Sequence, residues 1–236
     1  MSNSRPQTSE VLLLGDIEIQ ERLAYSSNNA FIVSVSYQDQ SELCVYKPEA
    51  GERPLWDFEP GLWKREVGAY ELSALFGWEI IPETLGRFDA PLGVGSIQKY
   101  IDFDPEEHYF TLVDQEKYMC EIEKVALFDF VANNADRKGG HFLIDENGHL
   151  WAIDHGLCFN EDPKLRTVVW DLGERTVPNN LKEDLRLAKP DVEETLSPYL
   201  SKREIELTIL RLEAVIKLEA FPDPGDGRRP YPWPLL

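Results

Sequence analysis

The sequence has little of several residue types, and each scarcity excludes a class of protein. Its 236 residues include three cysteines, Cys44, Cys120 and Cys158, and no two of them form a CxxC pair. Neither a disulfide framework nor a cysteine-based zinc site is therefore expected. Scattered cysteines of this kind are typical of a reducing compartment, so we expect a cytoplasmic location.

Long apolar runs are also missing. No stretch approaches the roughly 18 apolar residues that a membrane-spanning helix needs. The first residues, MSNSRPQTSE, are polar and lack the apolar core of a signal peptide. We expect no membrane insertion, and we expect residues 1–10 to form a disordered tail.

Positive charge is scarce, because 24 Lys and Arg stand against 43 Asp and Glu, for a net charge of −19. A surface this acidic repels nucleic acid and anionic membranes, so nucleic acid is not expected as a partner. A polyphosphate ligand would need local cations or metal ions. With 42% hydrophobic residues, the chain can bury the core of one medium domain or of two packed lobes.

The most informative stretch is residues 126–158, where an apolar helical segment runs into a polar turn and then into two short apolar runs. These runs, residues 142–144 and 150–153, flank Asn147-Gly148. Asn-Gly between apolar runs is a strong signal for a β-hairpin.

A hairpin brings its two ends together, so Asp136 and His141, which precede it, should lie near Asp154, which follows it. Two carboxylates and an imidazole at one point indicate a site for a divalent metal and phosphate.

This ordered set resembles the catalytic core of the protein-kinase-like fold, and its nearest branch is the phosphatidylinositol 3-/4-kinase-like group. The sequence motifs VYKP, GERPLWDF and NNADRKGGH also resemble those of a small bacterial subfamily. The resemblance covers residues 12–175. It implies a two-lobed α+β fold, with an antiparallel sheet and one helix in an N-terminal lobe, residues 11–101. A mostly helical C-terminal lobe, residues 102–236, would carry the catalytic hairpin.

Local patterns agree with this division. Alternating β-branched and aromatic residues predict strands, and apolar residues at helical spacing predict helices. The expected strands are residues 16–25, 30–37, 42–47, 78–87 and 94–101, and the expected helices are residues 61–76, 116–133 and two or three within 179–220. A capping box, Ser201 with Glu204, opens the last helix. Residues 102–115 are expected to be an acidic linker, and residues 157–175 to be irregular.

In the resembled family, a lysine that ends a strand reaches the nucleotide phosphates and pairs with a glutamate on a helix. Lys47 holds this position. Glu66 and Glu71 are both candidates for its partner, and the resemblance favours Glu66.

The turn of Ser26, Ser27, Asn28 and Asn29 is the candidate phosphate loop, because its backbone N–H groups and hydroxyls could cradle an anion. The segment of Gln98 and Tyr100 falls where the family joins its lobes and binds adenine through the backbone.

The resemblance also assigns roles around the hairpin. Asp154 would be the principal metal ligand, and Asp136 would accept the proton of the attacking hydroxyl or orient it. His141 stands where the family usually has an asparagine ligand, and a neutral imidazole prefers ions softer than Mg²⁺. Lys138 is a second departure, since the family usually has histidine there. Arg137 is expected to brace the loop by pairing with a carboxylate.

The sequence therefore favours an ATP-dependent phosphotransferase, an atypical kinase that uses ATP with Mg²⁺ or Mn²⁺. Its acceptor would be a protein or a small molecule rather than a lipid, because no basic or amphipathic membrane patch is present. A nucleotide-binding pseudokinase is one alternative. A metal-dependent hydrolase that uses Asp136, His141, Asp154 and His155 is another. Transfer of AMP in place of phosphate also stays open.

Overall fold

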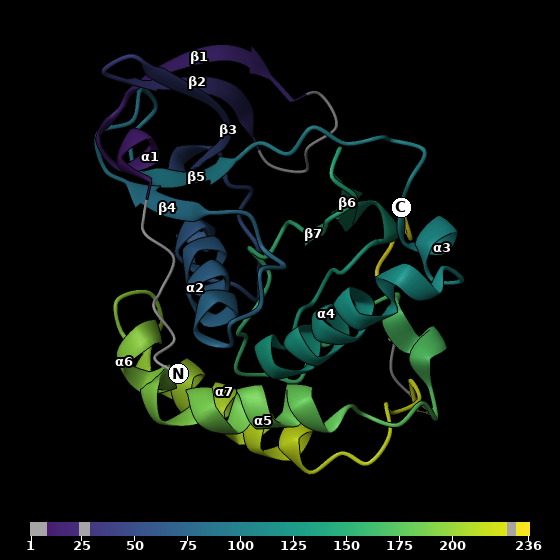
Figure 1. Ribbon diagram of the computed structural model, residues 1–236. Helices are drawn as coiled ribbons and strands as arrows, with labels where there is room; N and C mark the ends of the chain where they lie inside the picture. The colour runs from purple at the N-terminus through teal and green to yellow at the C-terminus, as the bar shows by residue number, and fades with distance from the viewer. Residues whose placement is uncertain (1–8, 24–28, 226–229) are drawn as a thin grey trace.

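The computed structural model of the chain describes residues 9–23, 29–225 and 230–236. Its main elements lie as Figure 1 shows, in the order α1 (Glu10–Leu14), β1 (Asp16–Arg22), β2 (Phe31–Tyr37), β3 (Gln40–Pro48), α2 (Leu62–Leu75), β4 (Thr84–Arg87), β5 (Gly95–Lys99), α3 (Tyr109–Leu112), α4 (Met119–Ala132), β6 (Phe142–Ile144), β7 (Leu150–Ala152), α5 (Asn179–Ala188), α6 (Val192–Leu196) and α7 (Lys202–Ile216). Short 3₁₀ turns lie at Glu49–Gly51, Glu116–Tyr118, Gly139–His141, Val169–Leu172 and Lys189–Asp191.

The N-terminal half is built on a five-stranded sheet in the order β1-β2-β3-β5-β4, and all of its neighbours pair antiparallel. The expected strands therefore form, but the one expected at residues 78–87 is confirmed only over Thr84–Arg87. Trp78, Ile80 and Ile81 are instead buried in the core of the C-terminal half. Apolar burial without strand pairing explains why this run resembled a strand.

Helix α1 lies against this sheet and closes its small core. Leu12 is fully buried among apolar residues of β2, β3 and β5. Arg87 donates hydrogen bonds to the carbonyl oxygens of Leu12 and Gly15, at 2.7 and 2.9 Å. The guanidinium thereby satisfies carbonyls at the end of the helix and ties α1 to β4. The predicted disordered tail of residues 1–10 is wrong for Glu10, which begins α1, and residues 1–8 lie outside the described part.

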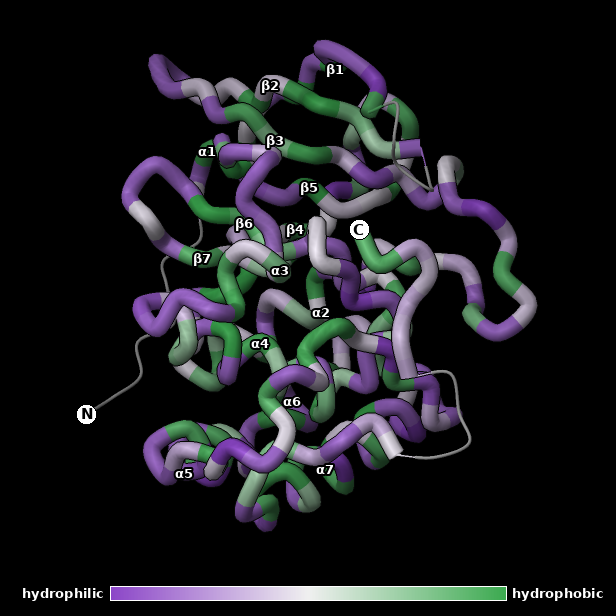
Figure 2. Tube along the Cα trace, turned by 90° about the vertical axis from the view of Figure 1, so that its right-hand side faces the viewer, coloured by the Kyte–Doolittle hydropathy of each residue, from purple (hydrophilic) through white to green (hydrophobic). Residues whose placement is uncertain are grey.

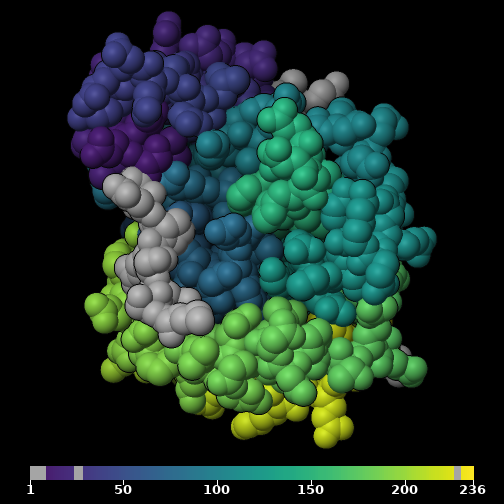
Figure 3. Space-filling model, viewed as in Figure 1, coloured from purple at the N-terminus to yellow at the C-terminus, as the bar shows by residue number. Residues whose placement is uncertain are grey.

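Helix α2 lies between the two halves (Figures 1 and 3). At its start, Trp63 packs so closely on β4 that a Cβ on Gly86 would lie 2.7 Å from the indole ring. Further along, Leu72 and Phe76 enter the larger core of the C-terminal half. Because α2 packs on the sheet at its start and enters the core of the C-terminal half further along, it fixes the distance between the two halves.

The C-terminal half is organised around α4. Eleven of its 14 residues are buried, so the helix is enclosed by the protein on most sides rather than on one face. Figure 2 shows α4 and the central strands coloured mainly as hydrophobic, with hydrophilic outer loops. The predicted acidic linker, residues 102–115, contains helix α3, whose Tyr109 and Leu112 are fully buried. The prediction of an acidic linker without a helix was wrong. The scattered acidic residues dominate the sequence pattern there and hide the two apolar residues that anchor the helix.

The predicted hairpin is present as β6 and β7. In its turn, Gly148 has φ +77°, and the Asp145 carboxylate accepts from the backbone N–H groups of Asn147 and His149. The Ala152 N–H donates to the Ile80 carbonyl oxygen at 2.6 Å, so the hairpin is also joined to the segment that precedes β4.

Three helices, α5, α6 and α7, form the base of the molecule in Figure 1. The capping box is confirmed, because Ser201 Oγ accepts from the Glu204 N–H and the Glu204 carboxylate accepts from the Ser201 N–H. Among the described residues, none of the helices has the length and apolar character needed to cross a membrane.

Replacing Ser201→Ala should lower the free energy of unfolding by about 1 kcal/mol, because one N-terminal N–H of α7 loses its acceptor. Urea denaturation monitored by circular dichroism measures this change. Ser197→Ala is the matched control, since Ser197 is exposed and its Oγ donates only to the Glu194 carbonyl oxygen. Equal stability of the two variants would contradict the role given to the cap.

Candidate active site

The site is centred on the ammonium group of Lys47, near the end of β3. Its Nζ lies 2.5 Å from Glu66 Oε1 on α2 and 2.9 Å from Asp154 Oδ1 after β7. Burial acts to lower the pKa of Lys47, but the Asp154 and Glu66 carboxylates outweigh it and hold the pKa above its ordinary value. The amine is therefore charged at neutral pH and attracts anions.

Glu66 connects three elements. Its Oε1 accepts from Lys47, and its Oε2 accepts from the backbone N–H of His155 at 3.0 Å. A Cβ on Gly156 would lie 3.3 Å from Glu66 Oε1, so glycine at this position allows the close approach of α2. Glu66 is thus the glutamate that contacts Lys47, the choice that the resemblance favoured over Glu71.

Asp154 has φ +64°, a left-handed conformation that few side chains other than Asn and Asp adopt. Its side chain is 49% exposed, with one oxygen toward Lys47 and the other 3.4 Å from His141 Nε2. The Lys47 charge is the main cause that lowers the pKa of Asp154 below its usual range, against the opposing effect of burial. The carboxylate is ionised and partly open to solvent, as a metal ligand must be.

His141 is a neutral imidazole. Burial lowers its pKa to about 3, although Asp154 acts in the opposite direction. Its Nδ1 accepts from the Lys138 backbone N–H at 3.4 Å, which leaves the ring hydrogen on Nε2, facing Asp154. To bind a metal through Nε2, the ring would have to carry its hydrogen on Nδ1 instead.

Asp136 lies beside these groups, with its side chain 28% exposed and one oxygen 3.1 Å from Lys138 Nζ. Burial raises the pKa of Asp136, and Lys138 partly offsets this effect. The charge of Asp154 also acts on Asp136. The hairpin therefore brings His141 and Asp154 within 3.4 Å of each other, as its geometry predicted, whereas the described contact of Asp136 is with Lys138.

A buried ion pair holds the catalytic loop from below. Arg137 and Asp129 are fully buried and form two hydrogen bonds of 3.0 Å, from Nε and from an Nη atom. Arg137 also donates to the Ile153 carbonyl oxygen at 2.7 Å and lies 2.6 Å from His155 Nε2. Arg137 has the bracing role expected from the sequence. The His155 imidazole thus makes its contacts within the protein, and it packs edge-on against Phe128.

Two asparagines of the turn have structural roles that the sequence analysis missed. Asn133 ends α4 with φ +53°, and its amide donates to the Asn160 and Asp162 carbonyl oxygens. Asn134 donates to Asp129 and accepts from the Asp136 N–H. The available signal was the Asn-Asn pair directly after an apolar helix, because asparagine tolerates the left-handed conformation that ends helices.

The predicted phosphate loop is described only in part, because Ser26, Ser27 and Asn28 lie outside the described residues. The Asn29 N–H donates to the Gly51 carbonyl oxygen at 3.1 Å. Of the predicted adenine segment, the buried Gln98 side chain donates to Thr84 Oγ1, and the Tyr100 N–H donates to the Leu43 carbonyl oxygen. These two groups are engaged within the sheet.

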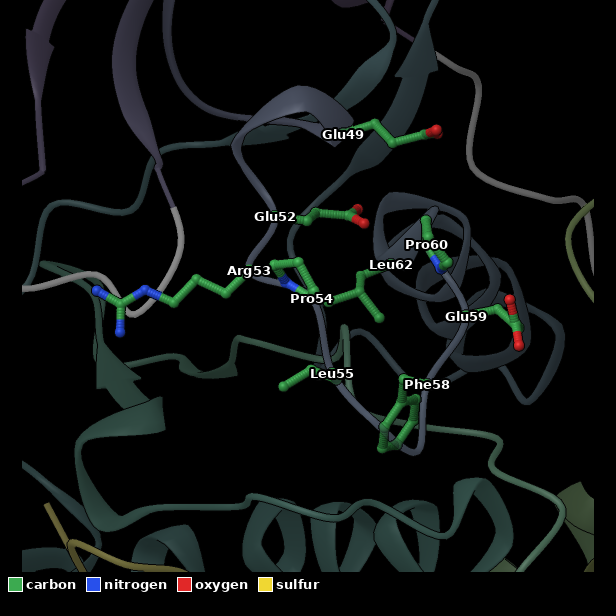
Figure 4. Close-up of a pocket in the computed structure, with 9 residues that line it drawn as sticks. All are labelled: Glu49, Glu52, Arg53, Pro54, Leu55, Phe58, Glu59, Pro60 and Leu62. Atoms are coloured by element: carbon green, nitrogen blue, oxygen red, sulfur yellow. The ribbon is translucent and has the colours of Figure 1, made fainter.

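The loop between β3 and α2 folds back over the start of the helix and lines a pocket (Figure 4). Glu52 accepts from the Gly61 and Trp63 N–H groups, whereas Figure 4 shows the Arg53 side chain extending away from the others. Phe58 and Leu62 pack with Ala135, the residue before Asp136. The loop therefore supports the catalytic turn from the N-terminal side.

Sequence comparison gives one family match and one relative that aligns along nearly the whole chain. The protein family described as phosphatidylinositol 3- and 4-kinase matches residues 87–197, which include Asp136, His141 and Asp154. The Mycobacterium tuberculosis protein Rv2133c is 31% identical over 271 residues, an alignment that covers 98% of this chain and 96% of that protein. The chain belongs to the same family as Rv2133c, and its central part matches the phosphatidylinositol 3- and 4-kinase family model.

Two solved structures share the fold of this kinase-like protein. The proinflammatory kinase CtkA of Helicobacter pylori aligns with a TM-score of 0.52 at 14% identity, over 86% of this chain and 92% of that chain. Hydra Fam20, solved with sugar, aligns with a TM-score of 0.53 at 14% identity, over 87% and 85%. The two-lobed kinase-like fold predicted from the sequence is confirmed.

The Arg137→Met substitution should lower the free energy of unfolding by about 3–5 kcal/mol, because it leaves Asp129 buried without its cation. Adding Asp129→Leu should recover part of this loss, because the double variant has no unpaired charge. Urea denaturation of both variants measures the loss of stability and its recovery. Arg186→Met is the control, since its pair with Glu183 is exposed and should be worth less than about 1 kcal/mol. A loss for Arg137→Met no larger than that of the control would contradict the bracing role.

Proposed function

We propose that this protein is an ATP-dependent phosphotransferase, an atypical kinase that acts on a metal-bound nucleotide. The observation that carries the proposal is the meeting of Lys47, from the sheet, with Asp154, from the hairpin, at 2.9 Å. Glu66 orients the amine from behind, and the family match covers the hairpin side of the site. A charged amine facing an exposed carboxylate is suited to hold a metal and a triphosphate together.

In this proposal Lys47 exchanges its contact with Asp154 for the phosphates and keeps Glu66. Asp154 is the principal metal ligand, and His141 is the second, once its ring hydrogen lies on Nδ1. Mg²⁺ or Mn²⁺ would supply the positive charge that neutralises the phosphates. The imidazole favours Mn²⁺ over Mg²⁺.

Asp136 orients the acceptor hydroxyl and takes its proton. The acceptor oxygen forms a bond to the γ-phosphorus, the bond from that phosphorus to the bridging oxygen breaks, and ADP leaves with the electron pair. The raised pKa of Asp136 suits proton transfer, and Lys138 holds its carboxylate in place. Adenine would be held by backbone groups of the segment from Gln98 to Ile101, and phosphate also by the loop of Ser26 to Asn29.

Two alternatives are less well supported. A pseudokinase is favoured by the Lys138 contact with Asp136, which competes for the proposed base. A hydrolase with a mixed site is disfavoured, because the His155 imidazole lies against Arg137 and Phe128. In the part of the chain that the structure describes, no group of three or more His, Cys, Asp and Glu is arranged to hold a metal.

Thermal unfolding with ATP and Mg²⁺ or Mn²⁺ tests the nucleotide site. Binding at about 100 times the dissociation constant should stabilise the protein by about 2.7 kcal/mol. Lys47→Ala and Asp154→Ala should lose this effect, whereas Lys189→Ala should keep it, because Lys189 pairs with Glu213 outside the site. A stabilisation that needs no metal, or one that survives Asp154→Ala, would contradict the proposed binding of metal and triphosphate by Lys47 and Asp154.

Asp136→Asn separates an active kinase from a pseudokinase. The variant should bind Mg²⁺–ATP as the parent does, but its turnover of ATP should fall by about 10²–10⁴-fold, the usual contribution of a positioned base. Release of ADP measures turnover. A parent protein that binds ATP but releases no ADP with cell extract as acceptor would favour the pseudokinase.

A further inference from the structure

The last residues of the chain lie across the catalytic loop. Residues 230–236, here called the strap, contact this loop and the segment that follows the Asp-His-Gly motif. The Leu235 carbonyl oxygen accepts from the Gly139 N–H at 2.7 Å. The Pro230 carbonyl oxygen accepts from the Thr167 N–H and from Trp170 Nε1, both at 3.0 Å. The strap is therefore anchored at both ends.

The strap covers an edge that could otherwise pair with a peptide. Residues 166–168 run parallel to the catalytic loop, since the Arg137 N–H donates to the Arg166 carbonyl oxygen and the Val168 N–H donates to the Arg137 carbonyl oxygen. The Thr167 N–H points away from the catalytic loop and donates to the Pro230 carbonyl oxygen. An extended polypeptide that binds by adding to a strand edge needs such an N–H.

The strap is also packed tightly at the catalytic loop. A Cβ on Gly139 would lie 2.7 Å from the Phe110 ring and 3.0 Å from the Leu236 side chain. Gly139 is buried and Thr167 is fully buried. Because prolines at positions 230, 232 and 234 have no N–H, the strap offers few donors of its own for a further strand.

The reacting groups nevertheless remain accessible to solvent. The Asp154 side chain is 49% exposed and the Asp136 side chain is 28% exposed. A small molecule can therefore reach them, whereas a polypeptide cannot pair with the Thr167 or Gly139 N–H groups while the strap is in place.

We propose that the strap excludes polypeptide acceptors and that the acceptor of this protein is a small molecule that carries a hydroxyl group. This inference rests on the proposed phosphotransferase function. It narrows that function, because the fold and the reacting groups are equally compatible with a protein acceptor.

The test compares the full chain with chains that end at Pro224 and at Pro234. The first lacks the whole strap, and the second lacks only Leu235 and Leu236, which contact Gly139. Trp233→Ala is the matched control, because this side chain lies in the strap but is 75% exposed. Each protein is incubated with radiolabelled ATP and Mn²⁺. Two quantities are measured: the label incorporated into dephosphorylated casein, and the ADP released when phosphate is transferred to water.

The full chain and Trp233→Ala should release ADP but label casein only at a low level. Both shortened chains should label casein about tenfold more than the full chain, while stabilisation by Mn²⁺–ATP stays unchanged. Equal labelling by the full chain would overturn the inference. The inference would also be overturned if a shortened chain folds and binds ATP but labels casein no more than the full chain does. If the chain ending at Pro224 does not fold, the chain ending at Pro234 provides this result. If no protein binds or consumes ATP, the proposed function itself is wrong and the inference fails with it.

Discussion

The Lys47 ammonium group lies between two carboxylates that come from different halves of the molecule. The pair with Glu66 is largely buried, and Glu66 also accepts from the His155 N–H, so β3, α2 and the turn after β7 are positioned by one side chain. The pair with Asp154 is half exposed, and exposed ion pairs contribute little to stability. The contact that joins the halves is thus easily exchanged, as the proposed function requires when phosphate takes the place of the carboxylate beside the amine.

Rigid support and exchangeable contacts are separated in this site. Below the catalytic loop, Arg137 and Asp129 are fully buried, and breaking such a pair is costly. Above it, Asp136, His141 and Asp154 hold their neighbours through partly exposed contacts. In the proposed function, this division lets the loop keep its backbone in place while these three side chains change partners, as preorganised sites require.

The parts of the fold that local chemistry determines could be predicted from the sequence. Asn147-Gly148 specified the hairpin, and the hairpin placed His141 beside Asp154. Residues 78–83 were mistaken for a strand, because apolar burial and strand pairing produce the same pattern over a short run.

Contacts between distant segments left no local signal. The bonds of the strap to Gly139 and Thr167 join residues far apart in the chain, and backbone carbonyls supply them whatever the side chains are. The measurement that tests the central claim most directly is a crystal structure with Mn²⁺ and a non-hydrolysable ATP analogue. We predict an anomalous Mn²⁺ peak beside Asp154, with phosphate oxygens in place of its contact to Lys47 Nζ. A nucleotide bound elsewhere, with the contact of 2.9 Å between Lys47 and Asp154 still closed, would contradict the account.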